Sequence, residues 1–294
     1  MFCRQNLLVG HFIPNRYQRP TPREYRGVHG VAYPVVDTIY NRDGLILKLT
    51  VLPEDYGREL TVLQAMNQQP GFPHLYDFFT FNAQHDDVQY GLVMDYEGET
   101  LHVVSGRTDR GISNANLMRI AFKLFWTMES LHLQGFCHRD LHAANVLIRR
   151  EHDGVVRLKI IDFGMSLPLT PSPVPERNLV SWHASLQVCQ HKPYTRYDDL
   201  TSAIFVAMWA IELNPFGEDH QQYLAEKVKF DQNPSAYFNR QLKWLARLYS
   251  EVDYQRTEGY SHHDLFEIFY KFDPDFDPTS PITYGVVNNR LIIE

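Results

Sequence analysis

The sequence predicts an α+β protein with two lobes: a small N-terminal lobe built on a β-sheet with one main helix, and a larger helical C-terminal lobe. Two observations support this fold class. Short strand-like runs separated by turns fill residues 25–98, whereas long stretches with helical periodicity follow in residues 99–294. Strands gathered in one part of a chain and helices in another are typical of α+β proteins. The length of 294 residues exceeds the ~100–200 residues of a usual single domain and suits two lobes.

The N-terminal lobe is predicted from turn signals and one amphipathic segment. Residues 1–24 are rich in Arg, Pro and Tyr and indicate an irregular lead-in. The turn at Asn41–Gly44 separates two apolar runs and therefore favours an antiparallel hairpin. Residues Pro53–Met66 place apolar side chains on one helical face, and Pro70–Pro73 ends that helix. The predicted strands are Val31–Val36, Leu45–Leu49, Leu75–Phe81 and Tyr90–Asp95.

The C-terminal lobe follows a crossing linker at residues 97–99. Ser113 or Asn114 is the expected N-cap of a helix whose apolar residues recur with a period of 3.6 as far as Leu131. A run that is nearly all apolar, Leu200–Leu213, indicates a helix buried on all sides. The remaining predicted element is a hairpin of Val146–Ile148 with Leu158–Ile161, turning at Asp153-Gly154.

The composition indicates which classes of partner and which cellular compartment to expect. Hydrophobic residues make up 44% and charged residues 21%, which is ordinary for a soluble globular protein. The net charge of −7 gives no reason to expect nucleic acid or an acidic membrane surface as a partner. Cys3, Cys137 and Cys189 are too few for a disulfide framework, which favours an intracellular location in the cytoplasm or nucleus. The longest apolar run, Ala203–Ile211, is too short to span a membrane. The oligomeric state is open, and a monomer is assumed.

Two motifs indicate the chemistry. Residues 138–145 read His-Arg-Asp-Leu-His-Ala-Ala-Asn, in which Asp140 and Asn145 have the H-R-D-x-x-x-x-N spacing of a phosphoryl-transfer loop. Residues 162–164 read Asp-Phe-Gly and directly follow a predicted strand. Either motif alone occurs often by chance. Both together, in this order and in this structural setting, indicate a catalytic centre.

On these motifs, the chain resembles the protein kinase superfamily over about residues 25–270. The resemblance implies one kinase domain, with an N-lobe at 25–98 and a C-lobe at 99–294. It also implies ATP and Mg²⁺ as cofactors, a protein as substrate, and transfer of the γ-phosphoryl group to a hydroxyl, on serine or threonine. Asp140 would be the catalytic base, and Asn145 and Asp162 would hold Mg²⁺.

The resemblance assigns further residues to the nucleotide. Lys48 would bind the α- and β-phosphates, and Glu59, on the next helix, would hold Lys48 in place. Without the two motifs downstream, Lys48 would be interpreted as a strand-edge lysine. Met94 falls at the gatekeeper position that precedes the adenine-binding backbone. The implied nucleotide-binding residues are Gly27, Gly30, Lys48, Met94, Asp95, Glu97 and Leu147, and the implied hydrophobic spine consists of Leu63, Phe78, His138 and Phe163.

Three positions depart from the family pattern. Tyr25 occupies the first position of the glycine-rich loop, which leaves only Gly27 and Gly30. Ile46 stands where the family has a small alanine over the adenine. His142 replaces the lysine that serine/threonine kinases place two residues after the catalytic aspartate. Because a histidine can gain a proton near neutral pH, His142 is kept among the catalytic residues, with packing or backbone bonding as the alternative role.

The region after the Asp-Phe-Gly motif narrows the group. Ser181–Gln187 contains no Ala-Pro-Glu, and Arg196–Ser202 reads Arg-Tyr-Asp-Asp-Leu-Thr-Ser. These segments, and more weakly Val252–Tyr254, resemble the casein kinase 1 group. In that group the residue matching Asp199 bonds the backbone of the catalytic loop; the alternative is that Asp199 caps the following helix.

Two other functions stay open at this point. The incomplete glycine-rich loop and Ile46 are compatible with a pseudokinase scaffold. The segment Asp140–Asn145 also resembles the D-L-H-x-x-N loop of small-molecule phosphotransferases, although Arg139 and the Arg196–Ser202 segment fit protein kinases better.

Overall fold

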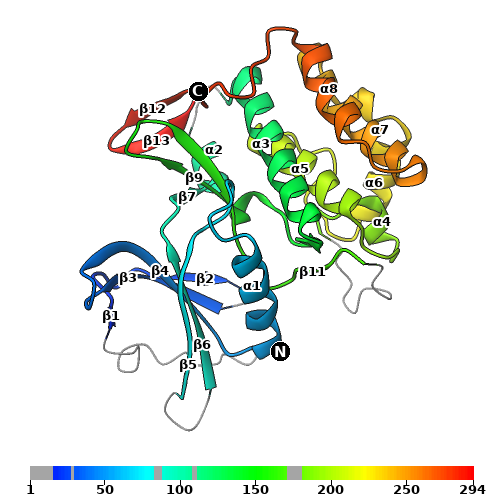
Figure 1. The fold of residues 1–294 in the computed structure, drawn as a ribbon. Coiled ribbons are helices and arrows are strands. Elements are labelled where there is room, and N and C mark those ends of the chain that lie inside the picture. Colours follow the sequence, from blue (N-terminus) through cyan, green and yellow to red (C-terminus); the bar gives the residue numbers. More distant parts are fainter. Residues whose placement is uncertain (1–15, 28–29, 83–87, 108–110, 171–180) are drawn as a thin grey trace. The chain divides into compact units, whose positions relative to one another are not determined.

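The computed structural model describes residues 16–27, 30–82, 88–107, 111–170 and 181–294. The chain divides into two compact units (Figure 1). The first unit consists of Met1–Glu97 with Asp162–Met165, and the second of Gly98–Ile161 with Ser166–Glu294. The strands gather in the first unit and the long helices in the second, so the two-lobed α+β prediction is confirmed.

An antiparallel sheet forms the first unit. Its described part has six strands. Five follow the order β1-β3-β4-β6-β5, and the sixth, β2, pairs with the N-terminal end of β3. Helix α1, the one helix among the described residues of this unit, begins at a proline, which is well suited to the first helical position. The elements are β1 (Tyr17–Gln18), β2 (Tyr25–Gly27), β3 (Gly30–Asp37), β4 (Arg42–Thr50), α1 (Pro53–Ala65), β5 (Leu75–Asn82) and β6 (Val88–Asp95).

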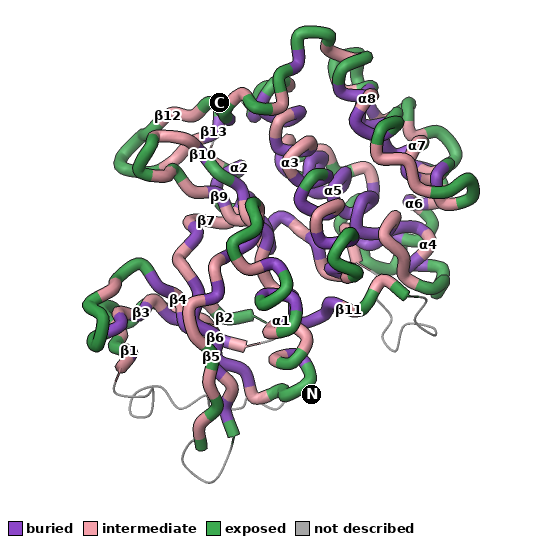
Figure 2. Tube along the Cα trace, in the orientation of Figure 1, coloured by how far each residue is buried: buried purple, intermediate pink, exposed green. Residues whose placement is uncertain are grey.

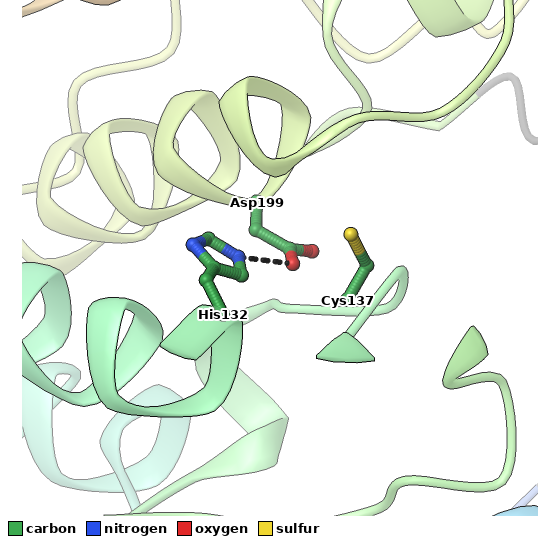
Figure 3. Close-up of side chains that lie close together, drawn as sticks. All are labelled: His132, Cys137 and Asp199. Atoms are coloured by element: carbon green, nitrogen blue, oxygen red, sulfur yellow. Dashed lines mark hydrogen bonds and ion pairs between the residues drawn. The ribbon is translucent and has the colours of Figure 1, made fainter. Parts of the chain in front are cut away.

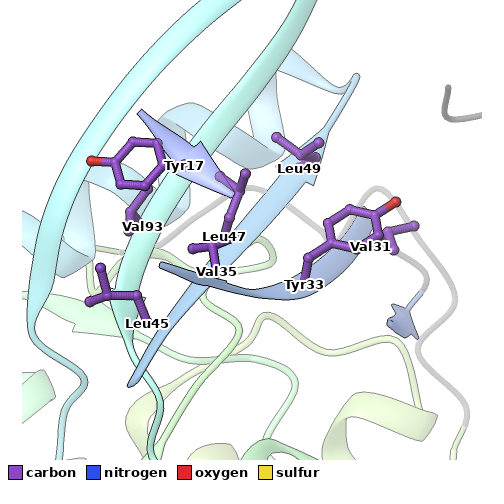
Figure 4. Packing of buried hydrophobic residues seen from close by; sticks show 8 residues of the cluster. All are labelled: Tyr17, Val31, Tyr33, Val35, Leu45, Leu47, Leu49 and Val93. Carbon is purple, nitrogen blue, oxygen red and sulfur yellow. The ribbon is translucent and has the colours of Figure 1, made fainter. Parts of the chain in front are cut away.

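Alternation along β3 and β4 sorts core residues from site residues. Successive side chains of a strand point to opposite faces, so every second residue can be buried together. Leu45, Leu47 and Leu49 of β4 turn towards the core, and Ile46 and Lys48 therefore lie on the other face. The buried cluster drawn in Figure 4 consists of Tyr17, Val31, Tyr33, Val35, Leu45, Leu47, Leu49 and Val93.

The lead-in is less irregular than the sequence indicates. Tyr17 and Gln18 pair with the end of β3, and the guanidinium of Arg16 bonds Asp37 at 2.7 Å and Asp77 at 2.9 Å. The Arg16 hydrogen bond holds the pKa of the Asp37 carboxyl well below its usual range. A two-residue strand is too short to show period-2 alternation, which explains why the sequence gives no sign of it.

Helices and, among the described residues, three small sheets form the second unit. A buried helix at its centre, α5, is covered on almost every side, as Figure 2 shows. Within the described residues, none of the helices combines the length and apolar character needed to cross a membrane. The elements are β7 (Glu99–Thr100), α2 (Leu101–Ser105), α3 (Asn114–Leu133), β8 (Phe136–Cys137), the 3₁₀ turn η2 (Ala143–Asn145), β9 (Val146–Arg150), β10 (Val156–Ile160), β11 (Leu167–Pro168), α4 (Leu186–Cys189), α5 (Arg196–Ala210), α6 (Tyr223–Gln232), the 3₁₀ turns η3 (Pro234–Tyr237) and η4 (Arg240–Leu242), α7 (Lys243–Glu258), α8 (His262–Phe272), β12 (Tyr284–Val287) and β13 (Arg290–Ile293).

Helix capping sets where the two central helices begin. The Ser113 hydroxyl accepts a hydrogen bond from a helical N–H at the start of α3, so the predicted cap is confirmed. Helix α5 starts at Arg196, four residues before the apolar run that predicted it. Its N-cap is Thr195, whose N–H and hydroxyl both donate to Asp198. The alternative role of Asp199 as the N-cap is therefore wrong.

A C-terminal hairpin completes the second unit. Strands β12 and β13 are joined by Asn288 and Asn289, whose φ angles of 50° and 61° are those of a tight two-residue turn. The amide nitrogen of Asn116, on α3, donates to the carbonyl groups of Thr283 and Glu294 and so ties the hairpin to the helix. The Asn-Asn pair between apolar runs is a signal that could have predicted this hairpin from the sequence.

Candidate active site

The candidate site in the first unit is built on a lysine that lies between two carboxylates. Lys48 Nζ lies 2.6 Å from Glu59 Oε2 and 2.8 Å from Asp162 Oδ1. Burial alone lowers the pKa of Lys48, but the two carboxylates outweigh burial and hold that pKa above its ordinary value. Lys48 is therefore a fixed ammonium group, and the sequence-predicted pair with Glu59 is present.

The Asp-Phe-Gly segment is fastened to this unit by two further contacts. Arg58, one residue before Glu59 on α1, donates from Nε to the carbonyl of Gly164 at 2.6 Å. The buried ring of Phe163 packs on Phe72, with 5.9 Å between ring centroids. Asp162 has a φ of 67°, a strained value for a residue that is not glycine, and these contacts help to hold it there.

The predicted spine contains one error. Leu63, Phe163 and His138 are fully buried, whereas Phe78 is 47% exposed. Phe78 lies on β5 among residues that alternate between half-buried and exposed, and its ring falls on the outward face. Phe72, in the turn before β5, supplies the buried ring instead. Within the first unit the segment around residues 70–73 has no strand or helix period, so the sequence offers no pattern that selects it.

The catalytic-loop residues contact one another in the second unit. Asn145 donates from its amide nitrogen to the Asp140 carbonyl at 2.9 Å and to the Asp140 carboxylate at 3.4 Å. The amide oxygen of Asn145 is thus the atom left to face a cation. The Asn145 carbonyl also accepts from the Ile161 N–H at 3.0 Å, which joins the loop to the residue before Asp162 along the chain.

His142 turns one nitrogen to the backbone and the other to Asp140. Its Nδ1 accepts a hydrogen bond from the Ala144 N–H at 3.2 Å, which caps the short turn η2. In this arrangement Nε2 carries the proton, and it lies 3.7 Å from Asp140 Oδ2. That separation is too long for a hydrogen bond, so the bond that the structure shows for His142 is the one to the backbone, which is the alternative role considered from the sequence.

Asp199 anchors the catalytic loop from α5. Its carboxylate accepts from the backbone N–H groups of His138 and Arg139 at 2.8 and 2.9 Å, and from the Tyr194 hydroxyl at 2.6 Å. His132, at the end of α3, bonds the same carboxylate at 2.9 Å (Figure 3). Burial raises the pKa of Asp199, but the His132 hydrogen bond and its neighbours lower it below the ordinary value. The predicted contact between Asp199 and the loop backbone is present.

Two clusters around the catalytic loop have metal-binding residue types without a suitable donor set. In the first, His132, Cys137 and Asp199 converge, but burial raises the pKa of the Cys137 thiol and the Asp199 oxygens already accept four hydrogen bonds. In the second, His142 joins Asp140 and His183, but its Nε2 carries a proton and has no lone pair for an ion. Both clusters hold the loop in place.

The residues predicted for adenine occupy the end of β6 and the linker. Met94 is buried opposite Ile46 in the sheet, and Ile46 lies on the same face of β4 as Lys48. The N–H groups of Asp95 and Tyr96 donate to the carbonyls of His74 and Gly44. The peptide N–H groups of these two residues are therefore used inside the first unit. Glu97 is buried at the end of this segment and Leu147 is half-buried on β9 of the second unit.

The two predicted phosphate-loop glycines differ in kind. Gly27 and Gly30 pair at the ends of β2 and β3; residues 28 and 29 of the predicted loop lie outside the described residues. At Gly30, φ is 150° and an added Cβ would lie 2.2 Å from the Leu49 carbonyl oxygen. At Gly27, the nearest atom of the described residues would lie 3.8 Å from an added Cβ. Gly30 is required by the fold, whereas Gly27 is sterically free to change.

We expect this difference to appear in a pair of variants. Gly30→Ala should lower the free energy of unfolding by about 2–4 kcal/mol, because both the backbone angle and the clash oppose a side chain. Gly27→Ala should change it by less than about 1 kcal/mol. If Gly27 lets backbone N–H groups approach phosphate, its alanine variant should nevertheless bind ATP more weakly. Urea unfolding and ATP titration of both variants check this, and equal losses of stability would contradict it.

The sequence-predicted residues thus form two groups, one in each unit. Lys48, Glu59 and Asp162 are in direct contact in the first, and Asp140, His142 and Asn145 in the second. Asp162 and Asn145 offer carboxylate and amide oxygens, the ligand type that Mg²⁺ prefers, so the residues present fit that ion. The sequence reasoning missed Arg58, His132 and Tyr194, which act through tertiary contacts and have no motif of their own.

Comparison with known proteins gives one family match and several partial relatives. A family model described as the protein kinase domain matches residues 47–261. The protein kinase gsk31 of Schizosaccharomyces pombe is 34% identical over 119 residues, which are 39% of this chain and 30% of that protein. The cell division control protein 2 homolog 2 of Trypanosoma brucei brucei is 24% identical over 158 residues, 54% of this chain and 45% of that protein. The serine/threonine/tyrosine-protein kinase HT1 of Arabidopsis thaliana is 29% identical over 126 residues, 42% of this chain and 31% of that protein. The chain therefore spans less than half the length of each of these relatives.

Proposed function

Because the chain belongs to the protein kinase family, we propose that it is an ATP- and Mg²⁺-dependent protein kinase that transfers the γ-phosphoryl group to a serine or threonine hydroxyl. The observation that carries the proposal is the partly buried Lys48 ammonium, held by both Glu59 and Asp162. A cation fixed by two acids, one of them in the Asp-Phe-Gly segment, suits a site that must orient a polyphosphate.

Each residue has a proposed task. Lys48 orients the α- and β-phosphates, and Glu59 keeps Lys48 in place. Asp140 accepts the proton of the acceptor hydroxyl and directs its oxygen at the phosphorus, while Asn145 holds the Asp140 carboxylate in position. Asp162 and the Asn145 amide oxygen would hold Mg²⁺, which when bound screens the negative charge of the phosphates.

We also propose that the chain is a divergent member of the casein kinase 1 group. The support is the residue pattern of Arg196–Ser202 and the absence of Ala-Pro-Glu from Ser181–Gln187. The similar proteins do not add to this support, because they are named for other kinase groups. Asp198 ties the Arg196–Ser202 segment to two other parts of the second unit. Its carboxylate accepts from Ser185 at 2.5 Å and pairs with Arg256 at 2.8 Å. The intracellular location and the lack of a nucleic-acid partner stay predictions from composition, and the monomeric state stays an assumption.

A transfer assay with three acceptor classes tests the function. The protein is incubated with labelled ATP, Mg²⁺ and, in separate reactions, casein, a set of serine and threonine peptides, and a panel of small alcohols including aminoglycosides and choline. We expect label on the protein or peptides, at serine or threonine. Label only on a small alcohol would indicate a small-molecule phosphotransferase. ATP binding in a thermal-shift assay without any transfer would indicate a pseudokinase scaffold.

A further inference from the structure

A small pocket in the second unit is lined by aromatic rings and an acid. It has a volume of about 270 Å³ and lies between α2 and the segment that follows α5. This is below the ~300–1,000 Å³ of pockets that enclose a whole small-molecule ligand, so its size suits one side chain. The lining includes His102, Trp182, Trp209 and Glu212, and neither arginine nor lysine is among the lining residues.

The two tryptophans form a rigid corner of this pocket. The ring of Trp182 is nearly perpendicular to that of Trp209, at 84°, with 5.3 Å between centroids. Trp182 is fixed because its indole N–H donates to the side chain of Asn214 at 2.7 Å. Trp209 remains 37% exposed although it lies on the otherwise buried helix α5. An exposed tryptophan face beside a second ring is the arrangement that attracts a cation through its π-electrons.

The pocket also has negative charge, from the Glu212 carboxylate and from the C-terminal end of α5. The Glu212 side chain is exposed and, within the described part of the chain, has neither a hydrogen-bond partner nor an ion-pair partner. The pocket also lies at the C-terminal end of α5, where the helix dipole is negative and favours cations. Carboxylate, helix end and ring faces therefore all favour the same ligand, a positively charged group.

Glu212 occupies a backbone position where glycine would be less strained. Its φ of 57° is left-handed, directly after the last turn of α5, which is where helices most often place glycine. The fold itself therefore gives no reason for a glutamate here. A charged residue in a conformation that favours glycine is accounted for if the carboxylate binds something.

The pocket is linked to the proposed catalytic loop through a ring contact of His183. Trp182 is followed by His183, whose ring lies 4.8 Å from that of His142, and His142 in turn faces Asp140. Burial, helped by His142, lowers the pKa of His183 to about 4, so this neighbour is neutral at physiological pH and does not repel a cation. A peptide whose hydroxyl reaches Asp140 would pass this pocket within a few residues.

From these contacts we propose that the pocket binds an arginine or lysine side chain of the acceptor protein, near the residue that is phosphorylated. The proposal rests on the proposed kinase function, since it names a feature of the substrate. The Trp209 and Trp182 rings contact the stem and the face of the basic group, and Glu212 neutralises its charge.

The test uses short serine peptides in which a single arginine is moved one position at a time through a neutral background. We expect one position at which arginine raises kcat/KM about tenfold over glutamine, mainly through a lower KM. Lysine there should be favoured less strongly, because arginine stacks better on a ring. Glu212→Gln should reduce the preference to about twofold or less. Glu218→Gln, which makes the same change on an exposed residue of the same segment, should leave the preference intact.

Two further measurements separate the pocket from the catalytic function. Glu212→Gly should melt no lower than the wild type, because glycine suits the left-handed position, yet it should also lose the preference. Binding of the best arginine peptide and its glutamine counterpart, followed by tryptophan fluorescence, needs no phosphoryl transfer. Transfer without any favoured arginine position, or a preference that survives Glu212→Gln, would overturn this inference and leave the proposed function standing. A fluorescence preference abolished by Glu212→Gln, in a protein that transfers no phosphate, would support the pocket and overturn the proposed function.

Discussion

Replacement of Asp162 by asparagine is expected to lower phosphoryl-transfer turnover about a hundred- to thousandfold, while the melting temperature changes little. The large effect follows from the loss of the carboxylate that would hold Mg²⁺ against the phosphates. The small effect on stability follows from the charges around Lys48. One ammonium between two carboxylates has a net charge of −1, so the asparagine variant leaves a neutral pair of Lys48 with Glu59 rather than an unpaired buried charge.

The matched control is Asp153→Asn. Asp153 is exposed and pairs with Arg157 at 2.6 Å, so the same chemical change is made away from the site. This control should keep wild-type turnover and melting temperature, because an exposed ion pair contributes little. Turnover of Asp162→Asn equal to that of the wild type would remove the assigned role of the Asp-Phe-Gly segment.

Lys227 is expected to make the stability of the protein depend on pH in a direction that is unusual for a lysine. Its ammonium group is 1% exposed and donates to the carbonyl of Trp182 at 2.8 Å, with the rings of Phe205 and Phe216 at 4.4 and 4.0 Å. Burial lowers the pKa of Lys227 from 10.5 to about 7, since the carbonyl and the rings replace only part of the lost hydration.

The sign follows from the protons bound in each state. Below pH 7 the folded and unfolded chains both hold the Lys227 proton. Between about pH 7 and 10.5 only the unfolded chain holds it, so the free energy of unfolding rises with pH, by up to about 1.4 kcal/mol per pH unit. Relative to Lys227→Met, the wild type should therefore gain about 2 kcal/mol between pH 7 and 9.

Urea unfolding of both proteins across this range measures the effect. Methionine is unbranched and apolar, so Lys227→Met keeps most of the volume and removes the titrating group. The control is Lys229→Met on the same helix, because Lys229 is largely exposed and pairs with Glu226. The Lys229→Met variant should run parallel to the wild type at every pH. A constant difference between wild type and Lys227→Met would show that Lys227 keeps its ordinary pKa in the folded state.

Local patterns predicted much of the fold and of the reacting groups. The hairpin of β3 and β4, helix α1 and the cap of α3 each have a sequence signal that acts within a few residues, and the structure contains all three. Asp140 and Asn145, like Lys48 and Glu59, were found because their separation along the chain is fixed by the loop or by a strand and the next helix.

What the sequence could not supply depends on contacts between distant segments. The strand β1 is held through Arg16, whose partners Asp37 and Asp77 are far from it in sequence. The choice of Phe72 rather than Phe78 depends on which side of β5 faces inwards, and a one-residue change of register reverses that side. The pocket of Trp182, Trp209 and Glu212 is invisible in the sequence, because no spacing rule brings those residues together.

The carboxylate of Asp199 has a consequence for how the molecule opens. It receives donors from the catalytic loop, from the end of α3 and from the segment before α5. Opening the loop alone would leave this buried charge with only two of its four donors, so we expect exchange of the His138 and Arg139 amide protons with solvent to be coupled to opening of the start of α5. The catalytic loop and the central helix thus form one cooperative unit. On heating, the loop keeps its native geometry until that unit melts, and it does not loosen at a lower temperature beforehand.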